Sequence, residues 1–328
     1  MRKIVPFVSK KIIRLVTLLV AISFISFLLV KKSPIDPIQA YIGADMLKVG
    51  PEQRAKIMNY WGLDQPLFTQ FYLWFTHLIK GDFGISMIYR RPVLDVIGER
   101  FFHSFVLMLI SWVISGILGF ILGSIAAMKK GTWIDRIIKS YCYILASTPT
   151  FWLGLLFLIV FAVWLRWFPI GMAAPPGILL EDVTLFDKLK HIILPAFTLS
   201  FLGVANIALH TRQKLIDVLS SDYILYARAR GESESTLYFR HGIRNVALPA
   251  LTLQFAAFSE LFGGAVLAEQ VFSYPGIGQA TVDAGLRGDV PLLLGIVIFS
   301  TIFVYVGNLI ADILYLLLDP RMKKGVAK

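Results

Sequence analysis

Side chains that could do chemistry are few in this sequence, and their spacing matches no catalytic or metal-binding pattern. The only cysteine, Cys142, lies in an apolar run, so we expect a buried and inert thiol rather than a disulfide or a metal ligand. The serines and aspartates show no spacing that suggests a nucleophile beside its base. We predict no catalytic residue and no metal site, because no H-E-x-x-H pair or cluster occurs among the five histidines: His77, His103, His191, His210 and His241.

The sequence also lacks the signature of a nucleotide site. It contains no G-x-x-x-x-G-K-[ST] phosphate loop, and the pair Gly276 and Gly278 follows no strand and opens no Rossmann unit. We therefore expect no cofactor on this chain and no enzymatic activity of its own. Any step that needs energy would have to be driven by another protein.

The hydropathy of the chain indicates an all-α integral membrane protein. Of its residues 57% are hydrophobic and only 16% are charged, and the mean hydropathy is +0.71. A helix that spans a bilayer needs about 20 mostly apolar residues. Six stretches qualify as transmembrane helices: 15–30, 105–127, 140–165, 192–209, 246–268 and 290–311, of which the last is expected to continue to Leu318.

The distribution of positive charge predicts the orientation of these helices. Lys and Arg number five in residues 1–14, four in 129–139, six in 210–245 and four in 319–328, whereas the connections between these clusters are sparser. By the positive-inside rule both termini are then cytoplasmic. The first apolar run ends in VKKSPID without a small-residue cleavage site, so we expect a retained helix. The net charge of +11 is interpreted as topology signals and lipid-facing charge, not as a nucleic-acid site.

This layout divides the chain into three parts. Residues 1–30 form a cytoplasmic tail and the first helix, residues 31–100 an extracytoplasmic segment, and residues 101–328 a five-helix core with a cytoplasmic loop at 210–249. The extracytoplasmic segment has two amphipathic patterns, one after Pro51 and one that stops at Gly81, and we expect two short helices on the outer membrane face. Packing onto the bundle and contact with a delivery protein both remain open as their role.

Polar residues inside the apolar stretches are the next candidates for function. Glu260 lies midway along the fifth span, where a charge is costly, so it either lines a polar pathway or hydrogen-bonds another helix. Asn308 and Asp312 share one face of the last span and suggest a clamp on a neighbouring helix. Gly119 and Gly123 allow close helix packing, within the chain by default or at a seam with a second membrane subunit.

The basic loop at 210–249 has the features of a short, stiff element. We predict one helix over 223–230, a left-handed turn at Gly231, a second short helix over 232–240, and the start of the fifth span at Leu248 and Pro249. Two interpretations follow from composition: a solvated loop that only sets topology, or a surface on which a soluble partner docks.

Several separated segments resemble one known family. YARARGESES at 226–235 and FRHGIRNVALP at 239–249 resemble the cytoplasmic coupling motif, or EAA loop, of inner-membrane subunits of binding-protein-dependent ABC importers. The dipeptide, oligopeptide and nickel permeases are matched, in order, by GLDQPLFTQFYLW, GDFGIS, EQVFSYPGIGQA and NLIADILYLLLDPR. The long outer segment is similar to that of the first of the two paired permeases in this family. At the EAA position stand Leu225, Tyr226 and Ala227, so only the last alanine fits the general consensus.

The resemblance implies a fold, partners and site residues. It implies a type I ABC importer permease fold in the bacterial plasma (inner) membrane, multi-pass and surrounded by lipid. Its partners would be a second homologous permease, two cytoplasmic ATPase subunits that hold ATP and Mg, and an extracytoplasmic substrate-binding protein. The outer rim would include Tyr274, Pro275, Gly276 and Gly278. The ATPase-coupling loop would consist of Tyr226, Ala227, Arg228, Ala229, Arg230, Gly231, Glu232, Ser233 and Glu234.

The sequence specifies the transported cargo less closely than the fold or the partners. We expect import of di- or oligopeptides, with nickel, metal chelates or oligosaccharides as the alternative for the same machinery. A stand-alone secondary transporter is a weaker alternative, because it would show internal repeats and coupling carboxylates, whereas this sequence has one deep glutamate, Glu260, and no repeat.

Overall fold

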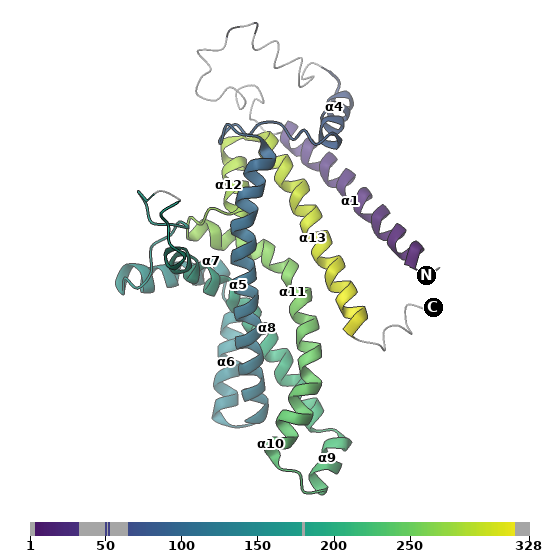
Figure 1. Cartoon of the computed structure of the whole chain (residues 1–328), viewed down its shortest axis with the longest axis vertical. Helices are drawn as coiled ribbons and strands as arrows, with labels where there is room; N and C mark the ends of the chain where they lie inside the picture. The colour runs from purple at the N-terminus through teal and green to yellow at the C-terminus, as the bar shows by residue number, and fades with distance from the viewer. Residues whose placement is uncertain (1–3, 33–49, 51, 53–64, 179–180, 319–328) are drawn as a thin grey trace. The chain divides into compact units, whose positions relative to one another are not determined.

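The computed structural model describes residues 4–32, 50, 52, 65–178 and 181–318, and Figure 1 shows that these residues are mostly helical. Among them the only extended pairing is a single bridge between Ile85 and Pro92. The chain divides into two compact units: residues 1–103 with 276–306, and residues 104–275 with 307–328. The expected all-α architecture is confirmed.

The first unit contains α1 (Ile4–Lys32), α4 (Leu67–Ile79) and α12 (Ile277–Arg287), together with the first parts of α5 (Val93–Met128) and α13 (Val290–Leu318). Helix α4 packs against α1 through aromatic rings, with Phe71 lying 5.2 Å from Phe24 between ring centroids. It is the second of the two predicted amphipathic helices, and it ends as expected just before Gly81, whose φ is +82°. The first predicted helix, after Pro51, lies outside the described residues.

A buried aspartate organises the segment between α4 and α5. Asp289 is fully buried, and its Oδ2 accepts hydrogen bonds from the Ser86 hydroxyl at 2.6 Å and from the Ile88 N–H at 3.0 Å. Its Oδ1 accepts from the N–H of Leu292, in the first turn of α13. Since a buried carboxylate is costly unless its oxygens are hydrogen-bonded, Asp289 fixes residues 86–88 to the start of α13.

The second unit is built around α8 (Leu185–Leu219), which has buried residues along most of its length. The rest of α5, α6 (Trp133–Ser147) and α11 (Arg244–Val271) pack beside it. Gly119 and Gly123 face α8: a Cβ on Gly119 would lie 2.7 Å from the Cβ of Ile207, and one on Gly123 would collide with the carbonyl oxygen of Ala208. The predicted close packing is confirmed within the chain, so α8 occupies the glycine face. Cys142 is buried in the α6–α8 contact, as expected.

The third predicted span, 140–165, is not one continuous helix. Helix α6 ends at Ser147, α7 (Thr150–Phe157) begins after Pro149 and continues as a π-helical segment, Leu158–Trp164, and the two axes differ by 107°. Pro149 has no N–H to donate and disfavours helical geometry at the preceding residue, and Thr148 is accordingly extended, with φ −93° and ψ 127°. The described helices therefore give five apolar spans, or six if this bent pair counts as one.

One basic residue that we interpreted as a topology signal has a structural role instead. The guanidinium of Arg212 on α8 donates two hydrogen bonds, of 2.6 and 2.8 Å, to the carboxylate of Asp135 on α6. Asp135 is 1% exposed and also accepts from the N–H of Gly131 at 3.0 Å. A bidentate pair of this kind fixes the angle between the two helices as well as neutralising the charges.

Candidate functional site

The segment around Gly231 forms a tight, well-bonded turn. Helix α9 (Asp222–Ala229) ends in a Schellman motif, in which the N–H of Gly231 donates to the carbonyl of Arg228 and the N–H of Glu232 donates to that of Ala227. Gly231 has φ +84°, a left-handed conformation that is unfavourable for residues with a Cβ. The predicted helix and the predicted turn are both confirmed.

The second predicted helix in this loop is not a separate element. Ser233 caps α10 (Glu234–Thr236) by accepting from the N–H of Thr236, and the helix then continues through a π-helical segment, Leu237–Ile243, into α11. Pro249 lies inside α11 and does not mark its start. The prediction of a short helix over 232–240 was therefore wrong in its end point, because nothing breaks the helix before Val271.

This continuity joins the turn rigidly to long helices. Ile224 and Ala227 of α9 form a small buried cluster with Leu237 of the π-helical segment. Gly242 lies so close to α8 that a Cβ there would be 2.8 Å from the Cδ1 of Leu215. Helix α9 is therefore connected to α8 and α11 through packed side chains and an unbroken helix.

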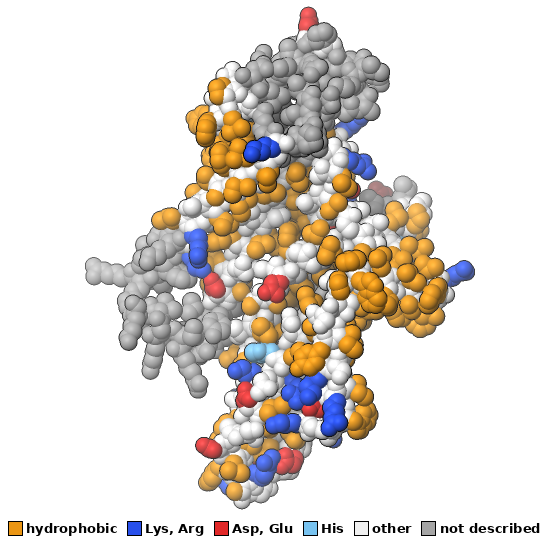
Figure 2. Space-filling model, turned by 180° about the vertical axis from the view of Figure 1, so that it is seen from behind, with side chains coloured by type: hydrophobic (Ala, Val, Ile, Leu, Met, Phe, Trp, Pro, Cys, Tyr) orange, Lys and Arg blue, Asp and Glu red, His pale blue; other side chains and the backbone are white. Residues whose placement is uncertain are grey.

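The outward side of α9 and the turn combines apolar and charged groups. Leu225 is 64% and Tyr226 66% exposed, and the guanidinium of Arg230 lies 6.0 Å from the centre of the Tyr226 ring. Arg228 pairs with Glu234 at 2.8 Å, and this carboxylate raises the pKa of the guanidinium. Figure 2 shows charged side chains gathered over the end of the second unit where α9 and α10 lie. Exposed aromatic, aliphatic and arginine side chains together are typical of a protein-binding surface.

The residues predicted for the outer rim are firmly packed. Tyr274 is 4% exposed, and its N–H donates to the carbonyl of Glu269 at 2.9 Å. Gly276 precedes α12 with φ −95° and Gly278 lies in the first turn of that helix, so neither takes the left-handed geometry of a glycine turn. Pro275 connects Tyr274 to Gly276. The buried Tyr274 ring does not present itself to a partner, and a rim role for these four residues stays a prediction.

The loop after α7 contacts the segment just before Tyr274. The N–H of Met172 donates to the carbonyl of Phe272 at 2.9 Å, and a Cβ on Gly171 would collide with that same oxygen. His191 at the start of α8 donates from Nδ1 to the carbonyl of Gly171 at 2.8 Å. This hydrogen bond connects the loop to α8.

The sequence analysis did not single out a buried carboxylate near the C-terminal end of α11. Glu269 is 0% exposed, and its Oε1 accepts from the hydroxyl of Ser104 on α5 at 2.5 Å. It stands in the stretch EQVFSYPGIGQA that carried part of the family resemblance, but it falls one residue beyond the predicted span. A search for ionisable residues at span ends would have found it.

Glu260, the deep glutamate that the sequence singled out, is exposed on α11 in this single chain. Within the described residues it has no hydrogen bond or ion pair, so a bond to another helix of this chain is not supported there. Its assignment to a polar pathway stays a prediction.

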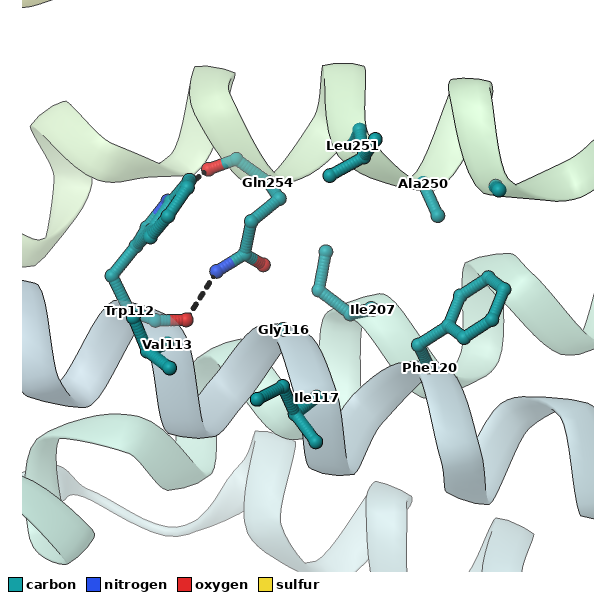
Figure 3. A pocket seen from close by; sticks show the side chains of 10 residues that line it. Trp112, Val113, Gly116, Ile117, Phe120, Ile207, Ala250, Leu251 and Gln254 are labelled. Carbon is teal, nitrogen blue, oxygen red and sulfur yellow. Dashed lines mark hydrogen bonds between the residues drawn. The ribbon is translucent and has the colours of Figure 1, made fainter.

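An apolar groove of about 360 Å³ lies between α5, α8 and α11 of the second unit. Figure 3 shows Trp112 and Gln254 at one end of it, where the indole N–H donates to the carbonyl of Gln254 at 2.7 Å and the Gln254 amide donates to the carbonyl of Trp112 at 2.5 Å. A Cβ on Gly116 would approach that amide to 3.1 Å. The groove therefore offers almost no free polar group, and it suits an apolar neighbour.

These features define a helical membrane protein with several apolar spans and a tightly bonded turn at Gly231. Comparison with known proteins agrees. Residues 119–324 match the family model of the binding-protein-dependent transport system inner membrane component, and residues 4–108 match the model of the N-terminal part of such membrane components. The chain belongs to this family of ABC importer permeases, and it is a multi-pass integral protein of the inner membrane.

Its relatives cover nearly the whole chain. It is 33% identical over 318 residues to the oligopeptide transport system permease protein AppB of Bacillus subtilis, an alignment that covers 97% of this chain and 99% of AppB. It is 36% identical over 322 residues to the glutathione transport system permease protein GsiC of Escherichia coli K12, covering 97% of this chain and 98% of GsiC. The expected membership of the peptide permease group is thereby confirmed.

Proposed function

We propose that this chain forms half of the translocation pathway of an ATP-driven importer of di- or oligopeptides and couples to the ATPase subunits through α9 and the turn at Gly231. The observation that supports the coupling part is the packing of α9 onto the π-helical segment that continues into α11, through the Ile224, Ala227 and Leu237 cluster, together with the close approach of Gly242 to Leu215 on α8. An element that transmits force must not yield where it meets the helices that it moves.

The partners follow from the family and from what this chain lacks. ATP and Mg bind to two cytoplasmic ATPase subunits, because this sequence has no phosphate loop. A second, homologous permease supplies the other wall of the pathway, and the binding protein presents cargo at the outer face. Both termini and the Gly231 turn lie on the cytoplasmic side, in keeping with the clusters of Lys and Arg.

Gly231→Trp tests the coupling role. Any side chain at φ +84° strains the turn by about 1–2 kcal/mol, although the space around the position is open. Because the bulk would also obstruct a partner's groove, we expect normal insertion, loss of ATPase binding in pull-down, and loss of uptake.

Gly131→Trp is the matched control, since Gly131 has φ +82°, open space around it, and a place in the turn between α5 and α6. It imposes the same strain away from α9, so it should retain ATPase binding. Equal loss of binding in both variants, or normal uptake by well-expressed Gly231→Trp, would contradict the coupling role.

The peptide assignment is supported by the two relatives, one an oligopeptide permease and one a glutathione permease, glutathione being itself a peptide. Import of nickel, metal chelates or oligosaccharides by the same machinery is the alternative. Reconstitution of the full complex with its binding protein decides between them. Short peptides, nickel chelates and oligosaccharides are compared for stimulation of ATP hydrolysis, and stimulation by a chelate or a sugar without any by peptides would refute the peptide assignment.

A further inference from the structure

A second cavity in the second unit, of about 610 Å³, differs from the apolar groove because its wall carries charged groups. It lies between α8, α11 and the end of α13, and its volume falls within the range of about 300–1,000 Å³ that is usual for small-molecule sites. His210 and Lys214 line it from α8, and Asp312 lines it from α13. Apolar residues of α11, such as Leu253, complete the wall.

The two basic side chains in this wall have no structural task. His210 and Lys214 are four residues apart and therefore project from the same face of α8. Throughout the part of the chain that the structure describes, neither has a hydrogen bond or an ion pair. Arg212, between them in sequence, is by contrast fully engaged with Asp135. The half-buried imidazole and the ammonium group, which have no hydrogen-bonding partner among the described residues, therefore provide donors for a small anion in one cavity.

The other residues of the wall favour a singly charged anion with an apolar body. Asp312 places a carboxylate in the same cavity, and it repels a multiply charged ligand such as a phosphate more strongly than a singly charged carboxylate. The aliphatic side chains of Leu248 and Leu253 suit a ligand with an apolar body. A short peptide carries one terminal carboxylate, one terminal ammonium group and side chains that are often apolar.

We infer that this cavity is a cargo site inside the permease, in which Lys214 and His210 bind the C-terminal carboxylate of a peptide. The inference rests on the proposed function, because it requires that the cargo is a peptide. The cavity contacts the main-chain terminus of the cargo rather than its side chains, so it accepts peptides of varied sequence. The anionic headgroup of a lipid is the competing occupant.

The test is direct binding of peptides to the complete transporter in nanodiscs, without nucleotide and without the binding protein, whose own affinity would mask the site. Radiolabelled trialanine is compared with trialanine amide, which lacks the terminal carboxylate. We expect the amide to bind at least about tenfold more weakly, the loss typical of a hydrogen bond to a charged group.

Lys214→Met should abolish this preference, so that both peptides bind equally weakly. The matched control is Lys188→Met, which removes an exposed lysine at the other end of α8 and should keep the wild-type preference. Equal binding of the two peptides to the wild type, or a preference that persists in both Lys214→Met and His210→Ala, would overturn the inference.

Three further outcomes distinguish the cargo site from the proposed function and from a lipid site. If the transporter imports trialanine but binds none without the binding protein, the cargo site is wrong and peptide import stands. If no peptide is imported or stimulates ATP hydrolysis, the proposed function itself fails. If phosphatidylglycerol in the nanodiscs displaces trialanine, and native mass spectrometry shows that Lys214→Met loses this lipid, the cavity is a headgroup site and the inference is overturned.

Discussion

At the scale of single residues, the charged side chains of this protein differ in whether they are paired within the described part of the chain. Asp135 and Arg212 are joined by two short hydrogen bonds, and Asp289 by three, so these groups hold the helices in place. Glu260, His210 and Lys214 have no such bonds among the described residues. Composition and charge counts treated all of them alike, because a sequence does not show which charges meet.

The buried pair gives a prediction at this scale. Arg212→Met should destabilise the protein by about 3–5 kcal/mol, because it leaves the carboxylate of Asp135 buried without its main partner. The double variant Asp135→Leu with Arg212→Met should recover most of that loss, since two apolar side chains replace two charges. The apparent melting temperature in detergent measures the stability of the single and the double variant. A double variant no more stable than Arg212→Met would show that the pair contributes more than charge neutralisation.

At the scale of elements, prolines mark where helices can bend and glycines mark where they can touch. The sequence predicted the glycine contact better than it predicted the bends. Pro149 breaks the third span and produces the 107° bend, whereas Pro195 and Pro249 lie inside continuous helices. A proline in an apolar stretch therefore does not by itself predict whether the helix breaks there. The sequence analysis likewise did not predict the π-helical segments Leu237–Ile243 and Leu158–Trp164.

The glycine contact between α5 and α8 gives a prediction at this scale. Gly123→Ala should lower stability, because the added Cβ collides with the carbonyl oxygen of Ala208 and forces the helices apart. Gly98→Ala is the control on the same helix, where the position is open, and it should be neutral or stabilise by about 0.5–1 kcal/mol. Thermal denaturation of both variants makes the comparison. Equal melting temperatures would mean that α5 and α8 can separate without cost.

At the scale of the whole molecule, the chain leaves much apolar surface uncovered, and this suits a subunit that works inside a complex and a bilayer. Large hydrophobic side chains on α1, α5 and α13 are exposed, among them Ile13, Ile117 and Ile310. Lipid can cover such residues, but Glu260, which has no hydrogen bond or ion pair within the described part of the chain, requires a polar neighbour. A pathway shared with a second permease would supply one.

Glu260→Gln tests that assignment. The variant should insert normally, since it removes a charge from an apolar helix, and substrate-stimulated ATP hydrolysis by the reconstituted complex should fall severalfold if the carboxylate meets the cargo. Glu181→Gln, in the exposed loop before α8, serves as the control and should leave stimulation unchanged. Unchanged stimulation in Glu260→Gln as well would instead favour a packing role for Glu260 against a partner subunit.

The sequence by itself determined the class of this protein, because hydropathy and the placement of Lys and Arg act locally along the chain and need no knowledge of contacts. It also predicted the helix before Gly231 and the turn itself, since a glycine at a helix end is a local signal. Only the tertiary structure decided which charges pair, where Glu269 and Asp289 are buried, that α11 begins before Pro249, and that His210, Lys214 and Asp312 line one cavity. These are properties of residues far apart in sequence, and only packing brings them together.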